Sequence, residues 1–243
     1  MITKNQIKSI SQLKQKKYRN LSKQFVVEGR KGVEELLNSD LKLVYIVTTN
    51  TEDFCVYGEQ RLVAKAEDMS KMSSMTTPPD CLAVFEMPTW KLSDVSGLIL
   101  ALDDIRDPGN LGTIIRLCDW YGIKYLICSE ETVDVFNPKV VQATMGSITR
   151  VQVIYTHLKS FLDNYTQPIF GTFMEGENIY TSVLPSEGCI VMGNEANGIS
   201  SEIENTISNR LTIPRFGDLQ QTESLNVAMA TAIVLSEFRR RFL

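Results

Sequence analysis

The chain has 243 residues, of which 43% are hydrophobic and 22% charged, a composition typical of globular proteins. This length suits one large domain or two small ones, at roughly 100–200 residues per domain, and argues against intrinsic disorder, a collagen-like repeat and a coiled coil. No apolar run approaches the roughly 20 residues of a membrane span, and the polar amino-terminal stretch does not resemble a signal peptide. We therefore expect a cytoplasmic protein with no membrane partner.

Cysteine and histidine are too scattered to predict a metal site. The five cysteines include no CxxC pair, and the single histidine, His157, cannot supply a His-rich ligand set. Cys118, Cys128 and Cys189 lie within apolar segments and are typical of small core residues. We expect no metal cofactor.

Charge is distributed unevenly along the chain. The net charge is −4, yet residues 1–31 carry nine Lys or Arg and one acid, which leaves −12 on the remaining residues. A basic segment attracts polyanions such as RNA, although a solvated helix face would have the same composition. Arg239, Arg240 and Arg241 form a second cluster, which a helix dipole explains without any ligand.

Residues 1–88 predict a small α/β domain. A modest apolar stripe from Ile7 to Leu21 indicates a helix, and two more are expected at 29–37 and 67–72. Short apolar runs predict strands at residues 25–27, 43–47, 61–64 and 81–85. Residues 89–96 are polar and without a clear period, and we interpret them as an interdomain linker.

Residues 97–243 predict a larger α/β domain in which strands and helices alternate. Strands are expected at residues 98–102, 125–128, 151–154, 169–172, 189–192 and 210–213. Helices are expected at about residues 110–121, 140–145 and 158–165, in a short stretch after Gly198, and from near Ser224 to the end. This order predicts a mainly parallel sheet with helices on both faces.

Three loops of this domain are rich in polar residues and glycine. Ligands of an open parallel sheet bind beyond the carboxyl ends of its strands, so these loops form the candidate site. The phosphate-binding motifs GxxxxGK[ST] and GxGxxG are absent, which disfavours a P-loop ATPase and a nicotinamide dehydrogenase. A Ser–His–Asp hydrolase would need His157, which lies in none of the three loops.

The first loop runs from Asp103 to Gly112 and leads to Arg116. Pro108 and Gly109 predict a turn, and Asn110 is a residue type that often caps the following helix. Arg116 lies six residues beyond Asn110, where its side chain can project toward the same opening. Capping and a functional role both remain open for Asn110.

The second and third loops offer a carboxylate and an amide. Glu195 stands between two glycine turns after a predicted strand, where it is either a solvent-facing acid or a functional one. In the third loop, Ser224 or Thr222 would cap the final helix. Capping explains Ser224 without catalysis, but it does not explain Asn226, a weak helix former.

Taken in this order, the three loops resemble the three motifs of the SpoU (TrmH-like) RNA 2′-O-methyltransferases. The matching stretches are 107–112 with Arg116, 192–199, and Ile213-Pro214 with 224–227. Arg215 stands where methionine is common in this family, and the stretch from Arg215 to Glu223 is a few residues longer. Residues 16–19 and 25–29 are similar to the L30-like RNA-binding domain that precedes many such enzymes.

The resemblance implies a SPOUT-type fold with a C-terminal trefoil knot, a homodimer, and S-adenosyl-L-methionine as the cofactor. The positions that match cofactor contacts are Thr172, Gly193, Ile213 and Leu225. The positions that match the catalytic cluster are Asn110, Arg116, Glu195, Ser224 and Asn226. The amino-terminal domain would bind RNA through Lys14, Lys16, Lys17, Arg19, Arg30 and Lys31.

The implied reaction methylates a ribose 2′-hydroxyl of structured RNA. The donor is already activated, so in-line positioning lowers most of the barrier and no metal is required. The resemblance casts Arg116 as the activating group; because arginine stays protonated, we hypothesise that it grips a phosphate and stabilises the developing oxyanion. By analogy we expect ribosomal RNA. A tRNA 2′-O-methyltransferase, a non-catalytic RNA-binding assembly factor and another small-molecule transferase stay open as alternatives.

Overall fold

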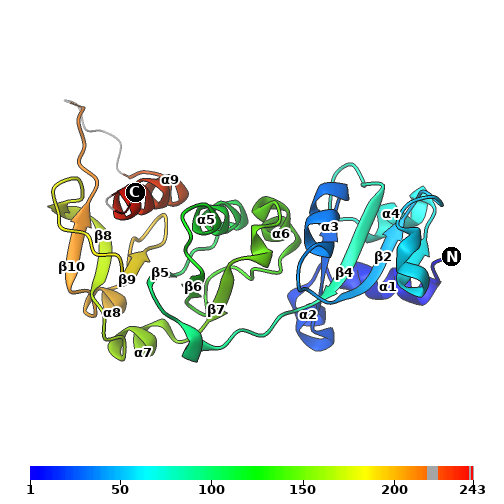
Figure 1. Cartoon of the computed structure of the whole chain (residues 1–243), viewed down its shortest axis with the longest axis horizontal. Coiled ribbons are helices and arrows are strands. Elements are labelled where there is room, and N and C mark those ends of the chain that lie inside the picture. Colours follow the sequence, from blue (N-terminus) through cyan, green and yellow to red (C-terminus); the bar gives the residue numbers. More distant parts are fainter. Residues whose placement is uncertain (218–223, 241, 243) are drawn as a thin grey trace. The chain divides into compact units, whose positions relative to one another are not determined.

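The computed structural model describes residues 1–217, 224–240 and 242. The chain divides into two compact units (Figure 1), which we describe separately. Unit 1 comprises Met1–Thr89 and Asp134–Thr149, and unit 2 comprises Trp90–Val133 and Arg150–Leu243. Within the described residues, no helix is long and apolar enough to cross a lipid bilayer.

Unit 1 is built on a four-stranded sheet in the order β1-β4-β2-β3. The strands β1, β2 and β4 pair antiparallel, whereas β3 pairs parallel to β2. Its strands are β1 (Gln24–Glu28), β2 (Leu43–Thr48), β3 (Arg61–Val63) and β4 (Cys81–Glu86). Its α-helices are α1 (Lys4–Gln12), α2 (Lys16–Ser22), α3 (Arg30–Leu37), α4 (Ala66–Met72) and α6 (Pro138–Thr144), and its 3-10 helices are η1 (Cys55–Gln60) and η3 (Ser147–Thr149).

The core of unit 1 is apolar on both faces of the sheet. On one face, Ile10 of α1 and Met69 of α4 pack against strand residues such as Val84 in a buried cluster. Elsewhere in this unit, Phe25 packs against Phe136, which precedes α6, with the centroids of the two rings 4.7 Å apart. Burial of such side chains is the dominant stabilising contribution to a fold of this kind, at about 1.5–3 kcal/mol per large residue.

Unit 2 is built on a six-stranded sheet in the order β10-β8-β9-β5-β6-β7, and each pair of neighbouring strands is parallel. The strands are β5 (Leu98–Leu102), β6 (Tyr125–Cys128), β7 (Gln152–Tyr155), β8 (Ile169–Asn178), β9 (Gly188–Met192) and β10 (Asn209–Thr212). The helices are η2 (Leu92–Asp94), α5 (Pro108–Trp120), α7 (Leu158–Asp163), α8 (Ser201–Glu204) and α9 (Val227–Arg240).

Helices cover both faces of this sheet. Leu158 of α7 and Ile203 of α8 share one buried cluster with Ile99 of the central strand β5. Helices α5 and α9 pack against each other (Figure 1), and Phe238 of α9 meets Phe170 of β8 edge-on at 5.2 Å. The prediction of a mainly parallel sheet with helices on both faces is therefore confirmed.

Two elements differ from the sequence-based expectation. The helix expected from Ile7 to Leu21 is two helices. Helix α1 ends where Leu13 turns into the core, and α2 begins at Lys16. Leu21, at 79% exposure, lies outside that core. Strand β8 extends to Asn178, well beyond residue 172, because its exposed polar half pairs with β10 after a register shift. An apolar run cannot reveal a strand whose second half faces solvent.

Candidate active site

The polar loops of unit 2 meet at one edge of its parallel sheet. They follow the carboxyl ends of β5, β9 and β10, as the general geometry of such sheets requires. The structure brings together one side chain from each loop: Asn110, Glu195 and Asn226. These residues are 85 and 116 positions apart in sequence, measured from Asn110.

Asn110 occupies the centre of this group. Its Nδ2 donates a hydrogen bond to Oε1 of Glu195 at 2.6 Å, and its Oδ1 accepts one from Nδ2 of Asn226 at 3.0 Å. A carboxylate only accepts, so Glu195 fixes which end of the Asn110 amide faces it. Both polar ends of the Asn110 side chain are thus bound, which orients the group before any ligand arrives.

Asn110 does not cap helix α5, contrary to one of the expectations above. The N-cap is Asp107, whose Oδ1 accepts from the backbone N–H of Asn110 at 2.8 Å, and the helix begins at Pro108. Proline is favoured at this first position because its missing N–H would have no helical partner there. With the cap supplied by Asp107, the Asn110 side chain is available for the network.

Asn226 holds the position that was expected for Ser224 or Thr222. Its Oδ1 accepts from the backbone N–H groups of Ala228 and Met229 at 3.0 and 3.3 Å, at the start of α9. Ser224 is exposed and lies before the helix, and Thr222 falls outside the described residues. Asn226 therefore has two roles: its side-chain oxygen caps α9, and its amide nitrogen donates a hydrogen bond to Asn110.

Two aspartates that the sequence analysis did not single out hold the Glu195 loop in place. The buried carboxylate of Asp103 accepts from the backbone N–H of Ser200 at 2.7 Å. The backbone carbonyl of Asp104 accepts from Nδ2 of Asn194 at 2.7 Å. The signal in the sequence is Asp103, an acid directly after a wholly apolar strand, where a buried carboxylate needs donors. Asp104 acts through its backbone, which no residue type reveals.

Gly193 is required by the tight fold of the same loop. Asn194 and Gly198 exchange two backbone hydrogen bonds, at 2.9 and 2.8 Å. A Cβ at position 193 would lie 2.2 Å from the carbonyl carbon of Gly198 and from the nitrogen of Ile199. Any side chain at this position would therefore displace the loop that carries Glu195.

Of the remaining cofactor-matching positions, Thr172 lies within β8, Ile213 follows β10, and Leu225 lies just before α9. Thr172 follows the last residue of β8 that pairs with β9, and its hydroxyl lies 3.6 Å from the sulfur of Met192. Ile213 directly follows β10, and Leu225, half exposed, precedes Asn226. Residues 218–223, in the lengthened part of this loop, lie outside the described residues.

Arg116 is on the surface of α5 and stands apart from the network. Its side chain is exposed, and among the described residues it has no ion-pair partner. By contrast Arg106 pairs with Asp104 at 2.8 Å, which raises the pKa of the guanidinium. Arg116 is thus a cation of the same helix as Asn110, six residues further on, and its donors are not used among the described residues.

The basic residues expected to bind RNA differ in their surroundings. Lys16, Lys17 and Lys31 are exposed, and Lys14 donates to the backbone carbonyl of Lys71 at 3.0 Å. Arg19 is buried, at 2% exposure; its guanidinium pairs with Asp134 at 2.6 Å and donates to two backbone carbonyls. Four hydrogen bonds from its buried guanidinium go to protein acceptors, so we exclude Arg19 from the RNA-contacting set.

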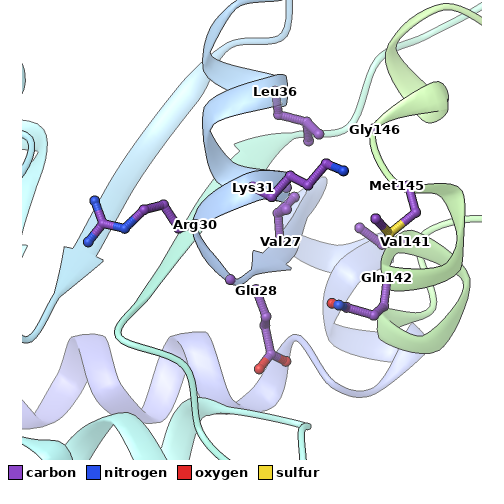
Figure 2. Close-up of a pocket in the computed structure, with 11 residues that line it drawn as sticks. Val27, Glu28, Arg30, Lys31, Leu36, Val141, Gln142, Met145 and Gly146 are labelled. Atoms are coloured by element: carbon purple, nitrogen blue, oxygen red, sulfur yellow. The ribbon is translucent and has the colours of Figure 1, made fainter.

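Arg30 and Lys31 begin helix α3 but point in different directions (Figure 2). Arg30 is bound by the carboxylates of Asp53 and Asp80, which raise its pKa. Lys31 lines a cavity of about 200 Å³, which Val141 and other residues close from the opposite side. The cation of Arg30 is therefore largely neutralised, whereas that of Lys31 is not.

The cysteines and the carboxyl-terminal arginines behave as core and helix-end residues. Burial raises the pKa of the Cys118, Cys128 and Cys189 thiols, which keeps them neutral. Arg239 of α9 donates to the carbonyls of Tyr121 and Gly122 at the end of α5. Arg241 lies outside the described residues.

Known proteins share both parts of the sequence. The SpoU rRNA Methylase family matches residues 97–236, and the MRM3-like substrate binding domain matches residues 4–83. A 23S rRNA (guanosine(2553)-2′-O)-methyltransferase, RlmP of Bacillus subtilis (strain 168), is 31% identical over 244 residues, which cover 97% of each chain.

Solved structures agree over the full length. A proposed RNA methyltransferase of the TrmH family from Porphyromonas gingivalis has a TM-score of 0.88 at 38% identity, and the match covers 99% of each chain. An AdoMet-bound rRNA methyltransferase from Sinorhizobium meliloti has a TM-score of 0.88 at 30% identity, covering 100% of this chain and 97% of the other.

The parallel sheet with helices on both faces defines an α/β protein, its polar network lies at the edge where such sheets bind ligands, and the shared sequence makes the class specific. The chain belongs to the SpoU rRNA Methylase family and carries an MRM3-like substrate binding domain at its amino-terminal end. The family predicted from the three motifs is confirmed.

Proposed function

We propose that this protein transfers a methyl group from S-adenosyl-L-methionine to a ribose 2′-hydroxyl of ribosomal RNA. The observation that carries the proposal is the hydrogen-bonded group Glu195–Asn110–Asn226, which joins all three family motifs at one edge of the sheet. The similarity to a 23S rRNA 2′-O-methyltransferase along nearly the whole chain supports ribosomal RNA over transfer RNA as the substrate class.

The residues proposed to hold the cofactor suit its chemistry. Thr172, Gly193, Ile213 and Leu225 carry no charge, as fits an adenosyl group that lacks phosphate. Gly193 leaves the main chain bare at the end of β9, where no side chain has room. When bound, S-adenosyl-L-methionine supplies a methyl group already activated by a positively charged sulfur.

The chain's own residues would orient the substrate and manage its charge. Glu195 holds Asn110, and Asn110 and Asn226 together present a rigid polar wall whose preorganisation favours in-line geometry. Ser224, two residues before Asn226, is exposed beside the same segment and is assigned to this cluster.

We assign to Arg116 the stabilisation of the 2′-oxygen as it loses its proton. The 2′-hydroxyl must be deprotonated near the transition state. Arginine is a poor base because it stays protonated, so the proton would pass to solvent water and not to Arg116. Its guanidinium is exposed and has no ion-pair partner in the described part of the chain. It is suited instead to bind an RNA phosphate in a bidentate manner and to stabilise negative charge on the oxygen.

The larger organisation is proposed on the same basis. Residues 1–88 would bind RNA and residues 97–243 would carry the chemistry, with 89–96 as the linker. We also propose a homodimer and a C-terminal trefoil knot, as the family resemblance implies. Trp120 and Met229, on helices α5 and α9, are 84% and 61% exposed in the single chain. A dimer that covers these helices would remove this apolar surface from water. The cytoplasm is the proposed location of an enzyme acting on ribosomal RNA.

The proposal is tested by mixing the protein with methyl-labelled cofactor and, separately, deproteinised ribosomal RNA or transfer RNA. Label should enter ribosomal RNA and survive in alkali-resistant dinucleotides, because a 2′-O-methyl group blocks cleavage of the adjacent phosphodiester bond. Label in transfer RNA alone would favour the tRNA alternative. No label and no heat of cofactor binding would identify a non-catalytic assembly factor instead.

A further inference from the structure

An open groove of about 550 Å³ lies along helices α1 and α4 of unit 1. Lys4 and Lys8 are one turn apart on α1, and Lys65 immediately precedes α4, which also carries Lys71. Ile2 and Ile7 add apolar surface to the same groove. The groove thus has a basic rim and a partly apolar lining.

The walls of the groove are held rigidly. The N-cap Thr3 and Gln6 form a capping box that fixes the start of α1. The backbone N–H of Ile2 donates to the carbonyl of Val63 at 2.9 Å, which ties the first residues to the end of β3. Buried Ile10 and Met69 pack α1 against α4. The lysines therefore project from a preorganised surface.

The positive charge of the groove is only partly neutralised. Asp68 is the one acid among the lining residues, and its carboxylate accepts from Lys71 at 2.8 Å, which raises the pKa of Lys71. Lys4, Lys8 and Lys65 are exposed and have no ion-pair partner within the described residues. The chain as a whole carries −4, so this groove is a local excess of positive charge.

Two arginines of unit 1 are already bound to carboxylates of the protein. Arg19 is bound to Asp134, and Arg30 to Asp53 and Asp80. An ammonium group is a compact charge on a flexible stem, and a row of such groups follows a phosphate backbone without reading its bases. The lysines of the groove are therefore better placed for a polyanion than the buried or paired arginines.

We propose that the α1–α4 groove binds the sugar–phosphate backbone of the RNA substrate, with Lys4, Lys8 and Lys65 neutralising its phosphates. This rests on the proposed function, since it names a surface by which the same substrate is held. The groove adds residues to the RNA-contacting set that the sequence motifs alone do not mark.

The experiment compares two full-length triple variants that lose the same charge. The groove variant is Lys4→Gln, Lys8→Gln and Lys65→Gln. The control variant is Lys42→Gln, Lys91→Gln and Lys124→Gln, at three exposed lysines outside the groove. Affinity for deproteinised ribosomal RNA is measured from 50 to 300 mM salt, about the range in which phosphate contacts are strongly salt-dependent, and cofactor binding is measured by calorimetry.

We expect the groove variant to bind RNA about 100-fold more weakly near 0.1 M salt, and its log–log salt slope to be shallower by about 2–3, because each phosphate contact contributes about 0.7–0.9. The control variant should keep both values, and both variants should keep the heat of cofactor binding. A single Lys8→Glu variant should weaken RNA binding in the same direction, which guards against a fold defect in the triple variant.

Equal affinity and equal slope in the groove variant and the control would overturn the inference, even if the wild-type protein methylates RNA. A groove variant that loses binding to phosphatidylserine vesicles but not to RNA would overturn it as well, and would assign the groove to a membrane surface. If the wild type binds RNA through the groove but methylates none, the groove stands and the proposed function fails.

Discussion

At the carboxyl edge of unit 2, polar side chains bind one another. Glu195 holds Asn110, Asn110 holds Asn226, and Asp103 fixes the loop that carries Glu195. In unit 1, the buried pair Arg19–Asp134 stabilises the fold, while exposed lysines such as Lys8 have no ion-pair partner within the described residues. An oriented neutral network suits the positioning of a reaction, and unpaired surface charge suits attraction of a polyanion.

Replacing Arg116 should have the largest effect and would separate chemistry from RNA affinity. Arg116→Ala should lower kcat by about 1,000-fold, because it removes a donor for charge that develops in the transition state. Cofactor binding, measured by calorimetry, should change little. Arg116→Lys keeps the charge but loses the bidentate fork, and should recover only part of the rate. Methylation by Arg116→Ala at the wild-type rate would contradict the assignment.

Breaking the Arg19–Asp134 pair should damage unit 1 without touching the network of unit 2. Arg19→Met should lower the free energy of unfolding by roughly 3 kcal/mol, because an unpaired carboxylate is left partly buried. Denaturant unfolding measures the change. The double variant Arg19→Met, Asp134→Leu should recover most of this loss, since no charge stays behind. Weaker RNA binding at unchanged stability would instead restore Arg19 to the RNA-contacting set.

Arg19 shows which contacts can and cannot be predicted from the sequence. Its basic neighbours predicted RNA contact, but its partner is 115 positions away and belongs to a segment, Asp134–Thr149, that groups with residues 1–89. No local pattern carries such a pairing. The convergence of the three loops, in contrast, followed from the order of strands and helices, because parallel strands end at one edge.

The two roles of Asn226 can be separated by two substitutions. Asn226→Ala should destabilise the protein by about 1 kcal/mol through loss of the cap on α9. Asn226→Asp keeps a capping oxygen but removes the N–H that Asn110 accepts. The Asn226→Asp variant should therefore keep most of the stability. Its kcat should fall about tenfold, because the loss of one hydrogen bond costs about 1.4 kcal/mol. Wild-type turnover in the Asp variant would reduce Asn226 to a cap.

Helix capping was the point that the sequence left open. Asn110 and Ser224 were candidates for helix caps, whereas Asp107 and Asn226 fill those places. Several Asx and Ser residues near each helix start satisfy the same pattern, and only backbone geometry decides among them. This selection matters for the site, because the residue that does not cap α5, Asn110, is free to join Glu195.

The smallest effect is expected at Asp80. The Arg30 guanidinium beside it holds the pKa of this carboxyl below its usual value near 3.8. A depressed native pKa stabilises the fold above that value, and the contribution is lost as the pH falls through the native pKa. Both side chains are more than a third exposed, so Asp80→Asn should cost less than about 1 kcal/mol at pH 7.

The difference between wild type and Asp80→Asn should shrink as the pH falls from about 4 through the lowered native pKa of Asp80, below which the wild-type carboxyl is also neutral. Thermal unfolding across this pH range measures it. An unchanged difference at low pH would mean that the aspartate acts through packing and not through its charge.

The long sequence separation within the group Glu195–Asn110–Asn226 affects when the site can form during synthesis. Asn226 reaches Asn110 across 116 positions, and contacts so far apart in the chain form late, because loop closure costs entropy before it is repaid. A growing polypeptide whose helix α9 has not yet left the ribosome cannot form the Asn226–Asn110 contact, so the group is incomplete. Uptake of the methyl donor would therefore report that synthesis and folding of this part of the chain have finished.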